Sequence, residues 1–199
     1  MTSTPRIVRA EPGRAARVSA LIAHAFVDLP PTRWLVADPV ERERRLDAQF
    51  VILVEHALRH GHVEVTSDGA AAAVWFHNDG AEPPPPPDYD ERLAAAAGPH
   101  LPRFRALDDA FAAHHPHEPH HHLAFLAVRP DRQRRGLGSL LLSRHHRRLD
   151  EAGIPAYLEA STTRSRDLYL RHGYELTGDP FHLPEDGPPF WPMWRVPGS

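Results

Sequence analysis

The first third of the chain spaces its apolar residues as amphipathic helices do. One stripe consists of Val18, Leu21, Ile22, Ala25, Phe26 and Leu29, and a second of Leu46, Phe50, Leu53, Val54, Ala57 and Leu58. Three- and four-residue steps of this kind place apolar side chains on one face of a helix. We therefore predict a short strand at 6–10, a helix from Pro12 that Pro30-Pro31 ends, and a second helix over 40–60 that Gly61 ends.

The middle of the chain carries strand, turn and connector signals. The segments HVEVTS at 62–67 and AAAVWFHN at 71–78 are of strand length, and the intervening residues include Asp68-Gly69. Asp-Gly is a strong hairpin turn signal, so the two segments are predicted to pair. The run PPPPP at 83–87 predicts a stiff polyproline connector, with a docking sequence for a proline-reading domain as the alternative. Helices are expected at 89–97 and 101–113.

The last third has the pattern of a strand, a loop, a helix and a second strand. HHLAFLAV at 121–128 is almost continuously apolar, which is typical of a strand covered on both faces. A helix that ends near Gly153 and a strand at 155–161 follow, and such a crossover joins parallel strands with a right-handed connection. A short helix around 168–169 and a last strand at 190–196 complete the pattern. It predicts one domain over 1–199 of the α+β (mixed α/β) class, with a central sheet flanked by helices.

Composition narrows the function classes. The 199 residues carry a net charge of −3, so the chain as a whole is not expected to bind nucleic acid. The absence of cysteine excludes disulfides, thiolate metal sites and a cysteine nucleophile. No apolar run reaches the length of a membrane span, and the first residues lack the apolar core of a signal peptide. We therefore expect a cytoplasmic protein that acts without a membrane partner.

The loop RPDRQRRGLGS at 129–139 combines backbone freedom with positive charge. Gly136 and Gly138 permit close approach to the backbone where a buried strand is predicted to turn into a helix. Unpaired amides and the positive end of the helix then face one spot, which favours a phosphate group. Arg132, Arg134 and Arg135 add charge around that spot. The alternative is a basic helix start that holds no ligand.

Two common phosphate-binding loops do not fit this stretch. A Walker loop requires Gly-Lys-Ser/Thr, which the loop lacks. A dinucleotide-binding fingerprint requires a third glycine where the chain has Leu141. Glu159 does occupy the strand position of that fingerprint's acidic residue. However, the crossover comes too late in the chain for the further strand–helix units of a Rossmann sheet.

The loop instead resembles the signature of the GCN5-related N-acetyltransferase (GNAT) superfamily. QRRGLG at 133–138 follows VRP at 128–130, as in the superfamily pattern, and a later block with Leu168-Tyr169 and Gly173-Tyr174 is similar to a second superfamily motif. Ser165 stands where the superfamily commonly has asparagine. Along essentially its whole length the chain is also similar to the puromycin N-acetyltransferase group, most clearly from 114 onward.

The resemblance implies a fold, a cosubstrate and a reaction. The fold is the GNAT-type acyl-CoA N-acyltransferase fold, in which a mixed sheet of about seven strands splays between 121–128 and 155–161. The reaction is transfer of an acetyl group from acetyl-CoA, without a metal, to a primary amine of a small, antibiotic-like molecule. A protein amino terminus or lysine is the alternative acceptor, and a sensor that binds acyl-CoA without turnover is the alternative to an enzyme. A homodimer is compatible with this resemblance.

The resemblance also implies which residues contact coenzyme A. They come from the end of the strand at 121–128, from the loop that follows it and from the short helix around 168–169. The expected contacts are Leu126, Ala127, Val128, Gln133, Arg134, Arg135, Gly136, Leu137, Gly138, Ser139, Ser165 and Tyr169.

Two residues are the first candidates for acid–base chemistry. By resemblance, the phenol of Tyr169 donates a proton to the departing coenzyme thiolate, with packing on the sheet as the alternative. Glu159, on one strand face with Tyr157 and Ser161, is the candidate base. A carboxylate in a covered strand is costly unless it faces a cleft or a partner, so an ion pair with a nearby arginine is the alternative. By resemblance, a backbone amide near Val128 stabilises the oxyanion.

Histidines cluster at 114–122, in the sequence HHPHEPHHH. Imidazoles beside Glu118 suggest zinc, but Pro116 and Pro119 interrupt the cluster and no further ligands complete it, so no metal site is predicted. Residues 114–117 are expected in a solvated loop. One of the three histidines at 120–122 is expected to line the acceptor pocket or assist the base, with His120 as the first candidate by resemblance and a structural role at the start of the strand as the alternative. Three aromatic residues are candidates for the acceptor wall, with core packing as the alternative: Phe26, Trp34 and Trp75.

Overall fold

The computed structural model describes residues 5–80 and 84–199. The predicted polyproline connector is described only in part, because 81–83 lie outside the described residues. The helices and strands, in chain order, are β1 (Ile7–Arg9), the 3₁₀ turn η1 (Pro12–Arg14), α1 (Ala15–Phe26), α2 (Pro30–Leu35), α3 (Pro39–His60), β2 (Gly61–Thr66), β3 (Ala71–Asn78), α4 (Tyr89–Ala97), η2 (Gly98–His100), α5 (Leu101–His114), β4 (His120–Val128), η3 (Pro130–Arg132), α6 (Leu137–Ala152), β5 (Ala156–Ala160), α7 (Thr163–Leu170), β6 (Glu175–Leu176), β7 (Phe181–His182) and β8 (Pro189–Arg195).

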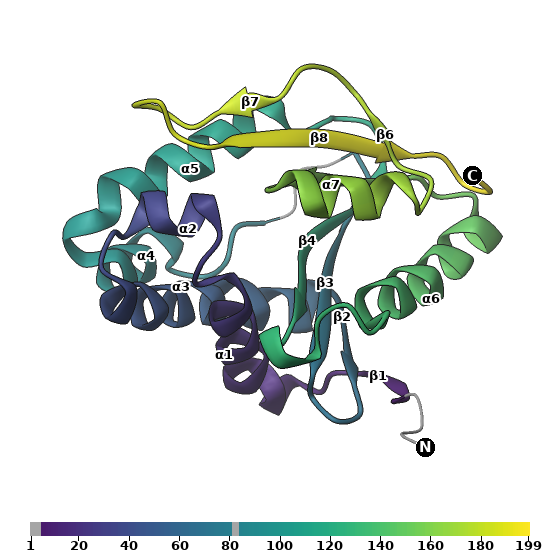
Figure 1. Ribbon diagram of the computed structural model, residues 1–199, viewed down its shortest axis with the longest axis horizontal. Coiled ribbons are helices and arrows are strands. Elements are labelled where there is room, and N and C mark those ends of the chain that lie inside the picture. The colour runs from purple at the N-terminus through teal and green to yellow at the C-terminus, as the bar shows by residue number, and fades with distance from the viewer. Residues whose placement is uncertain (1–4, 81–83) are drawn as a thin grey trace.

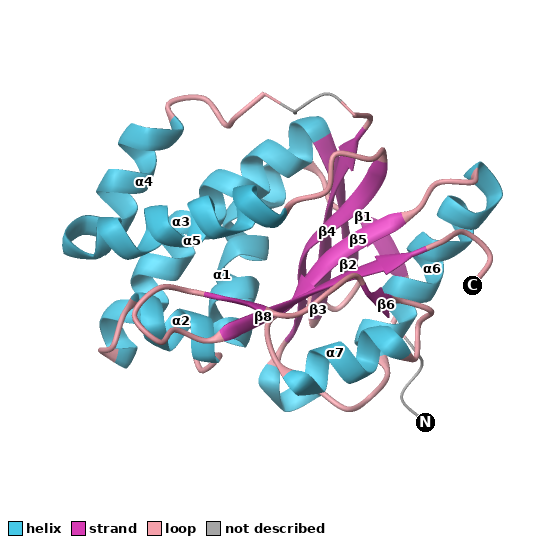
Figure 2. Cartoon of the chain, turned by 90° about the horizontal axis from the view of Figure 1, so that it is seen from above, coloured by secondary structure: helices cyan, strands magenta, loops and turns pink. Residues whose placement is uncertain are grey.

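A mixed sheet forms the centre of the molecule (Figure 1). Its strand order is β1-β2-β3-β4-β5-β8-β6, and β7 pairs with β8 outside this path. The pairs are antiparallel except for β4 and β5, which are parallel as the predicted crossover requires. Helices α1 to α5 lie on one side of the sheet, and α6 and α7 lie on the other (Figure 2). The predicted mixed sheet flanked by helices is therefore confirmed.

Prolines begin helices in the amino-terminal region. The chain leaves α1 at Phe26, and Pro30 and Pro31 form the first turn of α2, so the prediction that they only end a helix was wrong. The first residues of a helix donate no backbone hydrogen bonds within the helix. Proline, which lacks an N–H, is therefore favoured there. Leu29 before them is extended, at φ −69° and ψ 149°, because a following proline disfavours the helical conformation. The resulting bend turns α2 toward the site described below.

The sheet separates two apolar cores. Val74 of β3 packs into the core beneath α1 and α3 with Ile22 and Leu46, whereas its neighbour Trp75 packs into the core beneath α6 with Leu141. Burial on both faces explains why β3 and β4 are apolar almost without interruption. Within 5–80 and 84–199, no helix has the length and hydropathy needed to cross a membrane.

The strands β4 and β5 separate soon after they meet. They pair only at His121 and His122 of β4. From Leu123 to Val128, β4 continues along β3 alone, with a register irregularity that leaves Ala124 without a partner on β3. The predicted splay is confirmed, and it opens a wedge at the centre of the sheet.

Arg42 joins the first three helices. Its side chain is buried and its guanidinium donates hydrogen bonds to the carbonyl oxygens of Val36 at 2.6 Å, Val27 at 2.8 Å and Ala37 at 2.5 Å. These carbonyls belong to the segments that connect α1 to α2 and α2 to α3. Because a buried carbonyl without a donor is costly, Arg42 holds α2 in place.

Replacing Arg42 by methionine should lower the free energy of unfolding by about 3 kcal/mol, because three carbonyls lose their donor. Thermal unfolding should show a midpoint lower by about 6–12 °C for a chain of this size. Arg33→Met is the matched control. Arg33 is exposed and pairs only with exposed Asp28, so its loss should cost about 0.5 kcal/mol or less. Equal midpoints for the two variants would contradict the role given to Arg42.

Candidate active site

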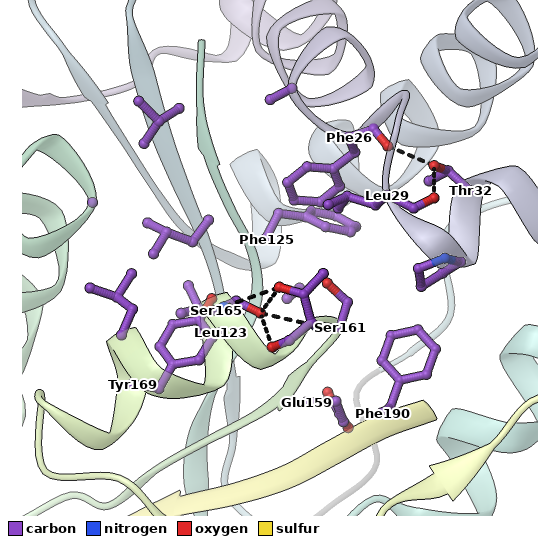
Figure 3. A pocket seen from close by; sticks show the side chains of 18 of the residues that line it. Phe26, Leu29, Thr32, Leu123, Phe125, Glu159, Ser161, Ser165, Tyr169 and Phe190 are labelled. Carbon is purple, nitrogen blue, oxygen red and sulfur yellow. Dashed lines mark hydrogen bonds between the residues drawn. The ribbon is translucent and has the colours of Figure 1, made fainter. Parts of the chain in front are cut away.

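A cavity of about 750 Å³ occupies the wedge between β4 and β5 (Figure 3). One end is lined by β4, the loop after it, the start of α6 and α7. The other end is lined by α1, α2, α3, α5 and the start of β8. A volume of this size is typical of small-molecule sites. The cavity therefore brings together segments from both halves of the chain.

The loop between β4 and α6 presents backbone amides to the first end. Arg134 and Gly136 adopt left-handed conformations, with φ of 61° and 78°. A Cβ on Gly136 would meet no atom within 4 Å, so this face of the residue is open. The N–H of Leu140 donates to Gly136 O at 2.9 Å, and the amides of 137–139 before it have no carbonyl partner within the helix. Such a helix start is suited to hold a phosphate.

The predicted coenzyme contacts divide into two sets. Those that line the cavity are Leu126, Val128, Gln133, Arg134, Gly136, Gly138, Ser139, Ser165 and Tyr169. Ala127 and Leu137 are buried in the two cores instead, and Arg135 is outside the lining. Arg132 also points elsewhere, because it pairs with Asp68 of the β2–β3 turn at 2.9 Å. Of the loop arginines, Arg134 is the one that lines the cavity.

Two backbone amides of β4 point into the wedge. The N–H of Arg129 donates to Ala70 O on the β3 side at 2.9 Å. Successive amides of a strand point to opposite edges, so the N–H groups of Val128 and Leu126 point toward β5. β5 has already diverged at this level and does not pair with them. A donor of the kind expected near Val128 is therefore available for an oxyanion.

Tyr169 of α7 both packs and lines the cavity (Figure 3). Its side chain is 8% exposed, and its ring meets that of Tyr174 edge to face at 5.8 Å. Burial raises the pKa of the Tyr169 phenol above its usual value. The hydroxyl is therefore protonated at neutral pH and able to donate a proton.

Ser165 caps the start of α7. Its hydroxyl oxygen accepts a hydrogen bond from the N–H of Thr162 at 3.1 Å, and its own N–H donates to Thr162 Oγ1 at 3.0 Å. This is a capping box in which serine takes the place of the more common glutamate or glutamine. The serine that replaces asparagine thus contacts the backbone and fixes the helix that carries Tyr169.

His122 and Glu159 line the cavity together with Phe190, and His115 lies beside Glu159. His122 Nε2 lies 2.9 Å from Glu159 Oε2, and His115 Nδ1 lies 3.8 Å from Glu159 Oε1. The Glu159 side chain is 3% exposed. Its ion-pair partners are thus histidines of β4 and of the segment before it. The expected alternative of an arginine partner was wrong.

The histidines determine how Glu159 titrates. Burial alone would raise the pKa of Glu159, but the charges and hydrogen bonds of His122 and His115 outweigh it and lower the pKa to about 2. The carboxylate thus stabilises the fold above its unfolded pKa near 4.5, and this contribution is lost as pH falls toward 2. A carboxylate with so low a pKa is a weak base at neutral pH. Because a carboxylate only accepts hydrogen bonds, Nε2 of His122 carries a proton, and in the neutral ring Nδ1 is the unprotonated nitrogen.

His120 does not reach the cavity. Its side chain is fully buried, its Nδ1 lies 2.6 Å from Glu118 O, and its ring packs on Tyr157. Burial lowers the pKa of His120 to about 4. The expectation that His120 lines the acceptor pocket was therefore wrong. Its position on β4, two residues before His122, places its side chain beneath β5. His122, two residues later on the same face, lines the cavity instead.

Residues 114–117 are not a simple solvated loop. His114 ends α5 and stacks on Phe181 with ring centroids 4.1 Å apart. His115 turns inward to Glu159, whereas His117 is exposed. The histidine-rich segment thus supplies one ion-pair partner to Glu159, which lines the cavity.

Aromatic side chains enclose the second end of the cavity. Phe26, Phe50 and Phe125 meet edge to face, with ring centroids 5.0–6.3 Å apart. Phe111 and Phe190 form a further edge-to-face pair at 4.8 Å. All five rings line the cavity. This end therefore favours an apolar or aromatic ligand.

Two of the three predicted wall residues lie elsewhere. Phe26 lines the cavity as expected. Trp75 is on the opposite face of the sheet, where it stacks on His145 at 4.1 Å. Trp34 packs against the guanidinium of Arg103 at 5.3 Å and is outside the lining. Core packing, the alternative weighed for these residues, holds for Trp75.

Asp108 of α5 is a second carboxyl group in the lining. Tyr89 donates a hydrogen bond from its hydroxyl to Asp108 Oδ2 at 2.8 Å. Burial raises the pKa of Asp108, against the opposing hydrogen bond from Tyr89. With Glu159, it gives the aromatic end of the cavity an acidic character.

Sequence reasoning missed His115, Asp108 and Phe190, and it ranked His120 above His122 among the histidines of β4. The signal for His122 was available, because it shares a strand face with His120 and pairs with the strand of Glu159. Asp108 and Phe190 come from elements far apart in the chain, and no local pattern marks them as neighbours of Glu159.

Comparisons with known proteins agree with this fold. Residues 105–176 match the family model of the acetyltransferase (GNAT) domain. The solved structure of histone acetyltransferase HPA2 and related acetyltransferase from Corynebacterium glutamicum is similar with a TM-score of 0.76 and 25% identity, over 99% of this chain and 98% of that chain. Two more distant structures share the fold. The polyamine N-acetyltransferase of Drosophila melanogaster has a TM-score of 0.63 at 18% identity, over 97% and 100% of the two chains. PaiA N-acetyltransferase from Thermoplasma acidophilum, in complex with coenzyme A, has a TM-score of 0.60 at 9% identity, over 98% and 99%.

Proposed function

The chain is an N-acetyltransferase of the GNAT family, and we propose that it transfers the acetyl group of acetyl-CoA to the primary amine of a small apolar molecule. The observation that carries this proposal is the arrangement of one cavity. Its first end presents the amides of 137–139 for the coenzyme, and its second end presents aromatic side chains for the acceptor. Tyr169 and the His122–Glu159 pair line the same cavity.

The coenzyme end supports a definite pose. The pyrophosphate lies against the start of α6, where the helix dipole and Arg134 offset its charge. The pantetheine arm then extends along the unpaired edge of β4, and its amide groups pair with backbone groups such as the N–H of Leu126. This places the thioester near Val128 and Tyr169, at the point where β4 and β5 diverge.

The reaction is a direct attack of the amine on the thioester. The amine nitrogen bonds to the carbonyl carbon, the oxygen becomes an oxyanion that the Val128 N–H stabilises, and the C–S bond then breaks. Tyr169 donates its proton to the departing thiolate. The proton lost by the amine passes to Nδ1 of His122, directly or through water, while Glu159 stabilises the resulting imidazolium. The base is thus the His122–Glu159 pair, with the proton on His122 rather than on Glu159 itself.

The second end of the cavity supports an amine with an apolar, preferably aromatic, substituent. Phe26, Phe50 and Phe125 offer ring faces and edges to such a group. Glu159 and Asp108 attract an ammonium ion toward the thioester. Aromatic monoamines are therefore expected to be the better acceptors, because their apolar substituent fills the aromatic end of the cavity.

A screen of amines with acetyl-CoA tests the proposed reaction. Release of free coenzyme thiol, followed with a thiol reagent, should depend on the amine and be fastest with arylalkyl amines, with puromycin included in the panel. Linear polyamines and peptides with a free amino terminus are the comparison sets. Turnover restricted to peptides would replace the small-molecule acceptor with a protein one, and binding of acetyl-CoA without turnover of any amine would contradict the enzyme.

Substitution of His122 tests its role as the base. His122→Gln should lower kcat by about 10²-fold, because the amine then loses its proton without a positioned base. His117→Gln, at an exposed histidine of the same segment, should keep the wild-type kcat. A kcat of His122→Gln within a few fold of the wild-type value would contradict the assignment.

A further inference from the structure

A second group of metal-binding side chains lies outside the cavity, between β2 and α6. His62 and Glu64 project from one face of β2, and His145 projects from α6, which packs beside it (Figure 1). One ligand atom from each of the three lies within 4.8 Å of the others. The side chains of Glu64 and His145 are 1% and 3% exposed. None of the three lines the active-site cavity.

Two buried atoms of this group have no hydrogen-bond partner among the described residues. They are Glu64 Oε2 and His145 Nδ1, and they face each other at 3.7 Å. His62 Nε2 lies 3.5 Å from the other oxygen, Glu64 Oε1. Ligands placed about 2.0–2.2 Å from a tetrahedral zinc ion are about 3.3–3.6 Å apart. The two observed separations, each to a different oxygen of Glu64, are longer than usual hydrogen bonds and close to the distance between two ligand atoms of one ion.

The ring of His145 is oriented as a metal ligand would be. It stacks on Trp75 with an interplanar angle of 14°, which fixes its plane. Its Nε2 lies 3.1 Å from His121 Nδ1. When Nε2 carries the proton and donates it to His121, Nδ1 directs a lone pair toward Glu64. A metal-bound histidine usually donates a hydrogen bond from its other ring nitrogen, and this bond fixes its tautomer and orientation.

Arg148 places a positive group beside two of the three side chains. Arg148 NH1 lies 2.9 Å from His62 Nε2 and 3.4 Å from Glu64 Oε1. A guanidinium can only donate, so His62 Nε2 is an acceptor whose lone pair points toward a cation. The Arg148 side chain is 47% exposed and can turn into solvent. Arg144 is the other arginine that pairs with Glu64. Its Nε lies 3.0 Å from the same oxygen, Oε1.

We propose that His62, Glu64 and His145 form a binding site for Zn²⁺ or a similar divalent ion of the late first transition row, which takes the place of Arg148. Two imidazoles and one carboxylate are a donor set that such ions favour. The bound ion ties β2 to α6 and thereby fixes the helix whose first turn forms the phosphate-binding loop. The site is separate from the catalytic cavity and does not depend on the proposed reaction.

The binding of Zn²⁺ and Co²⁺ to the full chain, without acetyl-CoA, tests this site. Zinc at a hundredfold excess over its dissociation constant should raise the unfolding midpoint by about 5 °C or more. Cobalt should give the visible absorption of a four-coordinate ion. His62→Gln, at the least buried ligand, should abolish both signals while the metal-free variant unfolds cooperatively. Arg148→Gln should tighten binding by roughly tenfold, because it removes a competing positive charge.

Two controls separate this site from other histidines. His122, His115 and Glu159 form another group that could hold an ion, so His122→Gln should retain the zinc and cobalt signals. His182→Gln, at an exposed histidine, should retain them too. The proposal is overturned if His62→Gln still gives both signals, if His122→Gln abolishes them, or if wild-type protein shows neither. Unchanged affinity in Arg148→Gln would contradict displacement of the guanidinium.

Discussion

Replacing Tyr169 by phenylalanine should lower kcat by about 10²–10³-fold, because the coenzyme thiolate then leaves without a proton. The dissociation constant of acetyl-CoA should stay within about twofold of the wild-type value, since the ring still packs against Tyr174. Steady-state kinetics with a saturating amine and a binding titration with acetyl-CoA give the two quantities. A loss in kcat without a loss in binding is expected of a general acid and not of a packing residue.

Tyr174→Phe is the matched control for this experiment. Its ring is buried against the same core, but its hydroxyl lies 3.1 Å from His146 Nε2 and is outside the cavity lining. This variant should lose stability and keep most of its turnover. A similar loss of turnover in the two variants would mean that the core around α7, and not the phenol of Tyr169, limits the reaction.

Replacing Gly136 by aspartate should weaken acetyl-CoA binding by about 100-fold or more. The Cβ of the added side chain would meet no atom within 4 Å, and its carboxylate would bring a negative charge near the amides of 137–139, where the pyrophosphate is proposed to lie. Titration of acetyl-CoA into the variant, together with the loss of its stabilising effect on unfolding, measures the change. Binding within a few fold of wild type would place the phosphate elsewhere.

Two variants separate charge from backbone strain at this position. Gly136→Ala imposes a side chain on the same left-handed backbone without a charge, so it should weaken binding much less. Gly153→Asp places the same side chain at the far end of α6, where φ is 67° and a Cβ also meets no atom within 4 Å. It should lose stability while binding acetyl-CoA normally.

Local sequence patterns predicted those parts of the fold that are decided locally. The strand, glycine loop and helix at 120–152 are set by an apolar run, by residues that allow left-handed backbone and by a helical stripe. All three signals lie within a few residues of the structure that they determine. The same holds for the β2–β3 hairpin and its Asp-Gly turn. The start of α2 at Pro30 was not predicted. A proline can end one helix and begin the next, and the sequence analysis considered only the end of the first helix.

The candidate site was less predictable, because its polar groups are paired across the sheet. Glu159 could be singled out as a carboxylate in a covered strand, but its partners are set by the register that places His122 of β4 beside β5. His120 and His122 are two residues apart on one face of β4, yet His120 is buried beneath Tyr157 and His122 lines the cavity. Likewise, Trp75 and Val74 are neighbours in sequence and face opposite cores. Which core or cavity such a residue faces depends on the order and register of the strands, and a single sequence does not reveal these.

A structure of the protein with bound coenzyme A tests the central claim most directly. It should show the pyrophosphate against the amides of 137–139, the pantetheine arm in the wedge between β4 and β5, and the sulfur within hydrogen-bonding reach of the Tyr169 hydroxyl. Coenzyme A bound away from the wedge, or bound there with its sulfur far from Tyr169, would contradict the account.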